Sequence, residues 1–204
     1  MTISPNVPLP RIVLIAGVPR SGSTWLFNAS RLLLRQAGIS LQAVWVEEYD
    51  PAHPAPVHLV KAHRPSEVSF APDLVLTTRR PTEACLASLI RMGWLANTPD
   101  AIRAAHKDHK ALYAHWQARS DLETPYDTIV RHPVDALSSL ADTLELTLST
   151  DELQQIATAL AQMRAPERGS YDRETLLHPN HRETGEVTGP RAADILRIID
   201  APDI

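Results

Sequence analysis

A turn bracketed by two glycines has the residue types and spacing that bind phosphate. It runs from Gly17 to Leu26 with the spacing G-x-x-x-x-G-x-[ST], and Ser23 stands where a nucleotidase carries lysine. Gly17 and Gly22 let the backbone turn tightly, so that consecutive N–H groups and a helix N-terminus can face one anion. Because the lysine is missing, the interpretation as a Mg-ATP site is weakened, and Arg20 becomes the cation nearest to the bound phosphate.

A second pair of chemically capable residues, Lys61 and His63, follows an apolar run that predicts a strand. If the extended conformation continues, its two-residue period puts both side chains on the same side. A histidine beside a lysine at a strand end can act as a general base beside an electrostatic stabiliser. The alternative is a hydrogen-bonded loop histidine next to a solvated lysine.

Two arginines, Arg79 and Arg80, end another apolar run and lead into a predicted helix that bears Ser88. Guanidinium groups next to a helix N-terminus predict a second anion site within reach of the first. The alternatives are surface arginines, or arginines that pair with Glu83. Tyr126 ends a short apolar segment, and taken alone it fits a core position.

Two histidine pairs, 106 with 109 and 178 with 181, have a spacing that could serve a metal. No cysteine or further clustered ligand completes a four-coordinate site, so we expect no metal. The single cysteine, Cys85, is expected to be a small buried hydrophobe within a helix. One cysteine excludes an internal disulfide and favours a reducing cytoplasm.

The elements that must position these residues alternate along the chain. Apolar runs that end in turns predict strands at 12–16, 42–46, 57–61 and 74–78. Helical periodicity and caps predict helices at 23–37, 81–92, 99–119, 133–146, from the cap at Ser149 to 163, and 191–199. The alternation indicates an α/β, P-loop-type three-layer domain with a mainly parallel central sheet flanked by helices. Ligand sites in such sheets lie beyond the carboxyl ends of the strands, where the turn after Gly17 would lie.

The composition is that of an ordinary globular domain. The chain has 204 residues, of which 44% are apolar and 22% charged. The proline-rich residues 1–10 are expected to be a flexible tail, and 11–204 a single domain. The net charge of −4 argues against a nucleic-acid partner, so an anionic ligand needs a local basic cluster. No signal peptide or apolar run of membrane-spanning length is visible, and we expect no membrane partner.

In sequence order, the motifs resemble those of the sulfotransferases that use 3′-phosphoadenosine 5′-phosphosulfate (PAPS), and among them a small bacterial-type member. Residues 19–25 are similar to the family's 5′-phosphosulfate loop, and residues 61–65 to its Lys-Thr-His-Leu-Pro segment. Residues 76–81 with Ser88 look like its 3′-phosphate motif, in which an arginine is followed by a helical serine.

Two further segments extend the resemblance towards the end of the chain. Residues 126–129, ahead of Pro133, resemble the family's Tyr-Glu-Asp-Leu segment. Residues 177–181, with the glycines at 185 and 189, are similar in kind to its C-terminal nucleotide-closing loop. The resemblance therefore covers most of the chain.

The resemblance implies that PAPS is the sulfuryl donor and that 3′-phosphoadenosine 5′-phosphate (PAP) is the product. The first motif would hold the 5′-phosphosulfate, and Trp25 would pack against adenine. Arg79 or Arg80, with Ser88, would hold the 3′-phosphate. The donor-binding residues implied in this way are Arg20, Ser21, Gly22, Ser23, Thr24, Trp25, Arg79, Arg80, Ser88, Tyr126, His181 and Arg182.

The resemblance also implies the chemistry, which is sulfuryl transfer to a hydroxyl or amine of a small-molecule acceptor. His63 would take the proton of the acceptor. Arg20 and Lys61 would stabilise charge on the sulfuryl group and on the leaving oxygen, so that no metal is required. In some relatives the base is a glutamate, which leaves Glu47 and Glu48 as rivals of His63.

Several points stay open at this stage. The family usually spaces its arginine and serine eight residues apart, which fits Arg80 with Ser88, whereas Arg79 fits the strand end better. A P-loop kinase, or a nucleotide-binding protein without sulfuryl transfer, is the alternative function. The identity of the acceptor and the oligomeric state are not indicated, although we expect the loops 49–56, 92–99 and 165–190 to form the acceptor pocket.

Overall fold

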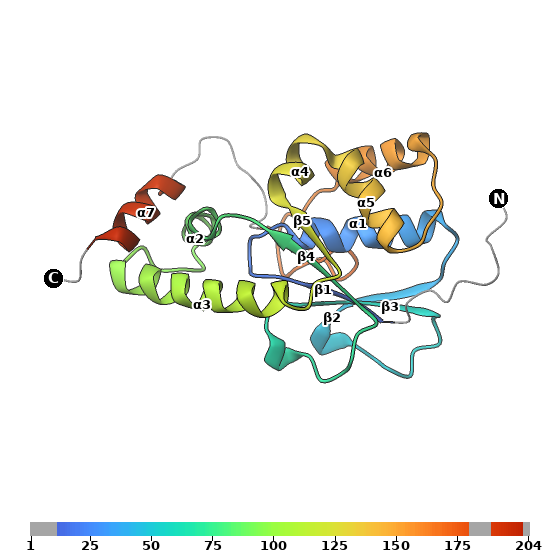
Figure 1. Ribbon diagram of the computed structural model, residues 1–204, viewed down its shortest axis with the longest axis horizontal. Coiled ribbons are helices and arrows are strands. Elements are labelled where there is room, and N and C mark those ends of the chain that lie inside the picture. The colour runs from blue at the N-terminus through green and yellow to red at the C-terminus, as the bar shows by residue number, and fades with distance from the viewer. Residues whose placement is uncertain (1–11, 180–188, 202–204) are drawn as a thin grey trace.

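A parallel β-sheet lies at the centre of the protein, whose computed structural model describes residues 12–179 and 189–201 (Figure 1). The strand order is β2-β3-β1-β4-β5, and every pairing of neighbours is parallel. The strands are β1 (Ile12–Ala16), β2 (Leu41–Trp45), β3 (Val57–Ala62), β4 (Leu74–Arg79) and β5 (Leu122–Pro125). This arrangement confirms the predicted α/β class and the mainly parallel sheet.

Helices connect the strands and cover both faces of the sheet. They are α1 (Ser23–Gln36), α2 (Thr82–Arg91), α3 (Pro99–Gln117), α4 (Tyr126–Arg131), α5 (Pro133–Thr143), α6 (Thr150–Gln162) and α7 (Ala192–Asp200), with short 3-10 turns η1 (Val46–Glu48) and η2 (Pro65–Glu67). Among the described residues, no helix is long and apolar enough to cross a lipid bilayer.

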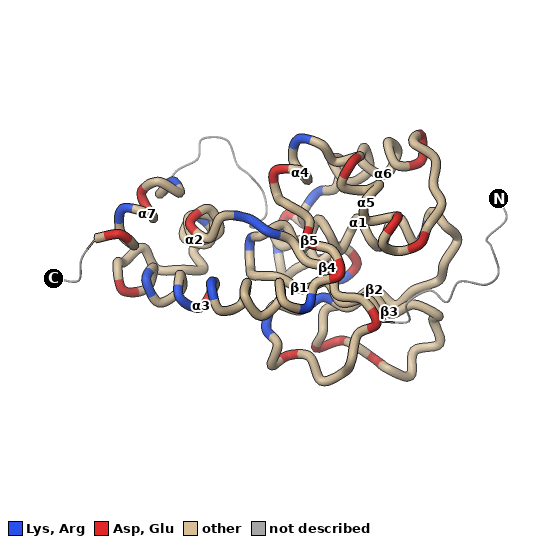
Figure 2. The backbone as a smooth tube through the Cα atoms, in the orientation of Figure 1, with Lys and Arg blue, Asp and Glu red and all other residues tan. Residues whose placement is uncertain are grey.

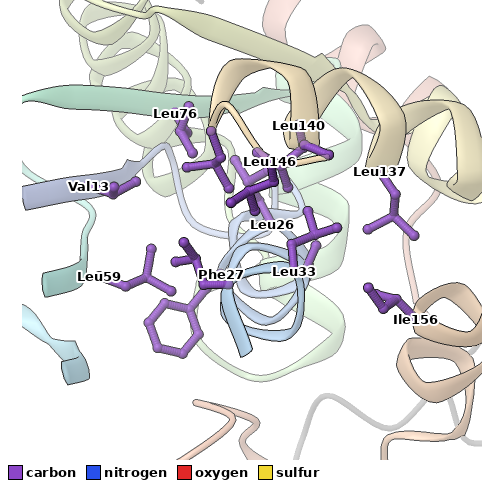
Figure 3. Packing of buried hydrophobic residues seen from close by; sticks show 14 of the residues in the cluster. Val13, Leu26, Phe27, Leu33, Leu59, Leu76, Leu137, Leu140, Leu146 and Ile156 are labelled. Carbon is purple, nitrogen blue, oxygen red and sulfur yellow. The ribbon is translucent and has the colours of Figure 1, made fainter. Parts of the chain in front are cut away.

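The alternation of side chains along β1 explains the layers. Val13 and Ile15 belong to the large core cluster that α1, α5 and α6 close from one side. Leu14 and Ala16 point to the opposite face, where Trp116 of α3 packs against them. Figure 3 shows side chains of the sheet, α1 and α5 meeting in the larger cluster. Both faces are therefore buried, as near-continuous apolar strands require.

A second group of helices extends the molecule to one side of the sheet. In Figure 1, α2, α7 and the beginning of α3 lie together there. Leu86, Ile102 and Ile195, one from each of these helices, are all fully buried against one another. The last described helix, α7, is thereby attached to the body that carries α2.

The sequence analysis predicted most elements and missed two. The segments 122–125 and 126–131, which form β5 and α4, were not predicted as strand and helix. β5 is a four-residue edge strand with two polar residues, and its pairing of Leu76 with Leu122 is made only in the tertiary structure. The predicted tail at 1–10 lies outside the described residues, as do His181 and Arg182.

Candidate active site

The glycine-bracketed turn joins the carboxyl end of β1 to the first turn of α1. Gly22 is the N-cap residue of α1, and its φ of 109° lies in the region that favours glycine. No side chain caps this helix. Within the described part of the chain, the backbone N–H groups of residues 22–25 donate to no protein acceptor. A 14-residue helix therefore presents its positive end and four unpaired donors at one point, which is an anion site.

The rest of the turn is fixed by contacts beneath it. The Ser21 hydroxyl is fully buried, donates to the Val18 carbonyl at 2.7 Å, and bonds the Thr78 hydroxyl of β4 at 2.7 Å. Arg20 has a φ of 68°, which is unfavourable for a residue with a side chain. Its carbonyl accepts a hydrogen bond from Nη1 of Arg80 at 3.1 Å. The turn is thus held in one conformation, strain included.

Two guanidinium groups stand beside the turn. Arg20 donates through Nε to the Ser88 hydroxyl of α2 at 3.0 Å. Arg80 lies over the Tyr126 ring, with its central carbon 4.1 Å from the ring centroid. Burial, and then the neighbouring Arg80, lower the pKa of Arg20. Two cations held this close to each other are poised to receive an anion.

Lys61 extends from β3 towards the same point. Its side chain is buried, and Nζ donates to the Thr24 hydroxyl at 2.6 Å and lies 5.7 Å from the centroid of the Trp45 ring. Burial, and then the charge of Arg20, lower the pKa of Lys61 to about 7. An anion bound at the turn would favour the charged ammonium form.

His63 lies two residues further on. Its Nδ1 is 2.7 Å from the carbonyl oxygen of Gly17, and since a carbonyl can only accept, Nδ1 carries the proton. Burial, and then the charge of Lys61, lower the pKa of His63 to about 3, although the side chain keeps some exposure. The imidazole is therefore neutral near pH 7, with the lone pair on Nε2, as a general base must be.

These groups line one cleft of about 370 Å³. Most of the other lining residues are aromatic or aliphatic. The lining residues are Pro19, Arg20, Gly22, Ser23, Thr24, Trp45, Glu47, Lys61, His63, Arg80, Trp94, Tyr126, Tyr171, Leu176, Leu177 and His178. We call the cationic residues around the turn the cationic half of the cleft, and its aromatic and aliphatic residues the apolar half; such a combination is typical of small-molecule sites.

Several residues named from the sequence lie outside this lining. Arg79 is exposed and faces Glu123 at 3.5 Å, whereas Arg80 enters the cleft. Trp25 packs against the main core cluster. Ser21 and Ser88 are buried behind the lining and hold the turn and Arg20 in place.

The rival bases differ in their surroundings. Glu47 is exposed and lines the cleft. Glu48 accepts a hydrogen bond from the Tyr171 hydroxyl at 3.0 Å and faces Arg173 at 3.5 Å. Of the two, only Glu47 is directed to the site.

Of the histidine pairs, His109 is buried and bonds the carbonyl of Ala105, while His178 meets the ring of Trp94 edge-on at the cleft. No group of three or more potential metal ligands occurs among the described residues.

Of the loops expected to form an acceptor pocket, 92–99 and 165–190 contribute to the apolar half of the cleft, whereas 49–56 does not line it; none of the apolar residues was named from the sequence. Trp45 ends β2, Trp94 follows α2, and Tyr171, Leu176 and Leu177 belong to an irregular segment. None has a spacing that marks it as a site residue. The predicted architecture indicated which loops could contribute, because loops at the carboxyl ends of the strands lie at the same sheet edge as the turn.

Comparisons with known proteins agree with this architecture. No protein-family model matches the sequence, and no curated protein matches it. The fold is similar to that of mouse sulfotransferase SULT7A1 complexed with PAP, at a TM-score of 0.57 and 16% identity over 76% of this chain and 64% of that one. It is similar to retinol dehydratase with retinol and PAP, at 0.55 and 14% over 76% and 65%.

A second structure of retinol dehydratase, with androsterone and inactive cofactor PAP, gives a TM-score of 0.53 and 15% identity over 73% of this chain and 64% of that one. The chain therefore has the fold of these solved structures and spans 64–65% of their length. At such identities, the likeness establishes the fold alone.

Proposed function

We propose that this protein is a sulfotransferase that moves a sulfuryl group from PAPS to a hydroxyl or amine of a small-molecule acceptor. The observation that carries the proposal is the meeting of an uncapped helix N-terminus, three cations and a neutral histidine in one cleft. The fold, shared with solved structures that contain PAP, supports it.

The donor would lie along the cationic half of the cleft. The free N–H groups of residues 22–25 would bind the 5′-phosphosulfate, together with Arg20 and Lys61. Arg80 is the stronger candidate for the 3′-phosphate, because it lines the cleft while Arg79 is paired with Glu123. Trp25 does not line the cleft, so it would contact adenine only if the base extends beyond the lining residues.

The transfer itself requires little covalent chemistry from the protein. The acceptor oxygen would attack sulfur as the bond from sulfur to the 5′-phosphate oxygen breaks, in line, and PAP would leave with that electron pair. Nε2 of His63 would take the acceptor proton, because Nδ1 is already committed to Gly17. Lys61 and Arg20 would stabilise the negative charge that grows on the leaving oxygen.

The acceptor would occupy the apolar half of the cleft. Trp45, Trp94 and Tyr171 offer flat aromatic faces there, and Leu176 and Leu177 offer aliphatic surface. Retinol and androsterone, present in structures of the same fold, are largely apolar molecules that carry a hydroxyl group at one end. We therefore expect an acceptor with an apolar body.

A screen for sulfuryl transfer tests this function. Purified protein, PAPS and panels of phenols, alcohols, sugars and amines would be analysed by mass spectrometry for a sulfated product and for PAP in equal amount. We expect a product with at least one apolar hydroxyl compound. Phosphorylation of any panel member from Mg-ATP, with none sulfated, would instead support the kinase alternative.

A further inference from the structure

One wall of the cleft consists of an irregular segment, residues 171–178, which is held by contacts with residues elsewhere in the chain. Tyr171, Leu176, Leu177 and His178 of this segment line the cleft. Within it, Asp172 accepts from the backbone and hydroxyl of Thr175, at 2.7 and 2.8 Å, and the Leu176 N–H donates to the Asp172 carbonyl at 2.7 Å. The segment has no regular secondary structure, so its position relative to the donor site depends on its external contacts.

Leu176 packs into the main core cluster, and a buried polar contact is made by Asn28, on the second turn of α1. Its Nδ2 donates to the Thr24 carbonyl at 2.9 Å and to the Thr175 carbonyl at 2.7 Å. Asn28 is only 2% exposed. A single amide group therefore joins the first turn of α1 to the wall of the cleft.

Arg31 completes the connection. Its Nη2 donates to Oδ1 of Asn28 at 3.2 Å, and its Nη1 to Glu174 at 2.5 Å. Arg35 donates to the same oxygen of Glu174 at 2.7 Å, yet its side chain is 48% exposed, against 4% for Arg31. Burial of the Arg31 guanidinium has a desolvation cost, which its bonds to Asn28 and Glu174 offset. These two bonds fix the orientation of the guanidinium between α1 and the wall.

The same first turn of α1 faces the donor. Thr24 accepts from Lys61 through its hydroxyl and from Asn28 through its carbonyl. Its N–H is one of the four unpaired donors at the anion site. A displacement of Thr24 on anion binding would thus be transmitted to Thr175 through one side chain.

We propose that Asn28 and Arg31 are positioning residues that couple occupancy of the donor site to the order of the wall formed by residues 171–178. This inference rests on the proposed function, since the anion that would occupy the site is PAPS or PAP. Neither residue touches the reacting atoms. Their effect would be to pre-organise the acceptor half of the cleft once the donor is bound, so that the acceptor binds second and more tightly.

Hydrogen exchange followed by mass spectrometry tests the coupling without any acceptor. Peptides that cover residues 171–178 would be compared with and without saturating PAP in four proteins: wild type, Asn28→Ala, Arg31→Met and Arg35→Met. We expect PAP to slow exchange about tenfold in wild type and in Arg35→Met, the exposed control, within the usual range of coupling between sites. In Asn28→Ala and Arg31→Met, the slowing should be less than about twofold although PAP still binds.

The outcomes separate this inference from the proposed function. Wild-type protein that fails to bind PAP contradicts the function. PAP binding with unchanged exchange in wild type, or with equal slowing in Asn28→Ala and Arg31→Met, overturns the coupling and leaves the function intact. If Asn28→Ala does not fold, Arg31→Met decides alone. Steady-state kinetics with PAPS and a hydroxyl compound found to be sulfated in the screen described above add a second readout. The KM for that compound should rise about tenfold in both variants, while kcat and the KM for PAPS change less than about threefold.

Discussion

At the scale of single residues, His63 and Lys61 divide the work by their protonation. His63 is held neutral with its free lone pair on Nε2, and Lys61 is buried where an added anion would favour its charged form. Their two-residue spacing, predicted from the sequence, brings both to the cleft. The roles assigned to them stay predictions that substitution can test.

Replacing His63 by Ala or Gln should lower kcat about 10²- to 10⁴-fold, the usual contribution of a general base. PAP affinity should change by less than about twofold, because the ring contacts the turn and not the phosphate donors. Stopped-time product analysis and calorimetry measure the two quantities. Glu47→Gln is the matched control and should keep kcat within about threefold. A large loss of kcat in Glu47→Gln, with little loss in the His63 variants, would identify Glu47 as the base.

Lys61 should make PAP binding depend on pH above neutrality. Its pKa of about 7 without a bound anion should rise when PAP binds, so the complex holds more protons than the free protein. PAP affinity should therefore fall as pH rises from 7 to 9, by up to about tenfold per pH unit. Calorimetric titrations at several pH values measure this slope.

Lys61→Met serves as the control for that slope. The variant should bind PAP more weakly and lose the pH dependence. Without PAP, the gain in unfolding free energy of Lys61→Met over wild type should be larger at pH 6 than at pH 9. The reason is that a lysine whose folded-state pKa is lowered from 10.5 to about 7 destabilises the folded protein most at the pH values where it must carry its charge. A slope that persists in Lys61→Met would assign it to another group.

The neighbouring arginines provide a second matched pair. Arg80→Ala should weaken PAP binding about 10- to 100-fold, since its guanidinium lines the cleft over Tyr126. Arg79→Ala removes only an exposed pair with Glu123 and should change affinity by less than about twofold. Calorimetry with PAP measures both. Equal losses of PAP affinity in the two variants would show that the connection between β4 and α2 rearranges when PAP binds.

At the scale of elements, the connection between β1 and α1 is the part that the sequence predicted best. Its spacing, its glycines and its position at a strand end all follow from local sequence. The connection from β5 to α4 was missed, because the strand is short and polar and its partner β4 lies more than 40 residues away in the chain. Yet α4 matters to the site, since Tyr126 packs against both Gly22 and Arg80.

That contact makes Gly22 sensitive to substitution. A Cβ on Gly22 would lie 3.1 Å from Cδ2 of Tyr126, at a φ of 109° that disfavours side chains. Gly22→Ala should cost about 1–3 kcal/mol of stability and reduce PAP affinity at least tenfold. Gly38→Ala, at a φ of 76° with open space around it, should cost about 1 kcal/mol and leave PAP affinity unchanged. Denaturant unfolding and calorimetry measure these changes; weakened PAP binding in both variants would reflect general instability.

At the scale of the whole molecule, the net charge of −4 is compatible with an anion site because the cations are local. Figure 2 shows basic and acidic residues interspersed along the backbone. Arg20, Lys61 and Arg80 come from three separate segments and meet only through the order of the strands. Composition could therefore not reveal the site, whereas motif order could.

The loops 92–99 and 165–190 were expected to form a pocket, but the individual residues of the apolar half could not be named from the sequence. Trp45, Trp94 and Tyr171 come from the end of a strand and two loops, and aromatic residues in loops carry no periodic signal. Their convergence depends on tertiary contacts such as those of Asn28 and Glu48 with the segment at 171–178. We propose that residues 11–204 form a single domain around these contacts.

The central claim is that the cleft recognises a phosphosulfate nucleotide, and calorimetric titration with PAP against Mg-ATP tests it most directly. In EDTA, the account predicts saturable binding of PAP at one site per chain and at least tenfold weaker binding in Arg80→Ala. It also predicts that Mg-ATP, with magnesium in excess and no EDTA, binds far more weakly. Tight magnesium-dependent binding of ATP together with no binding of PAP would contradict it.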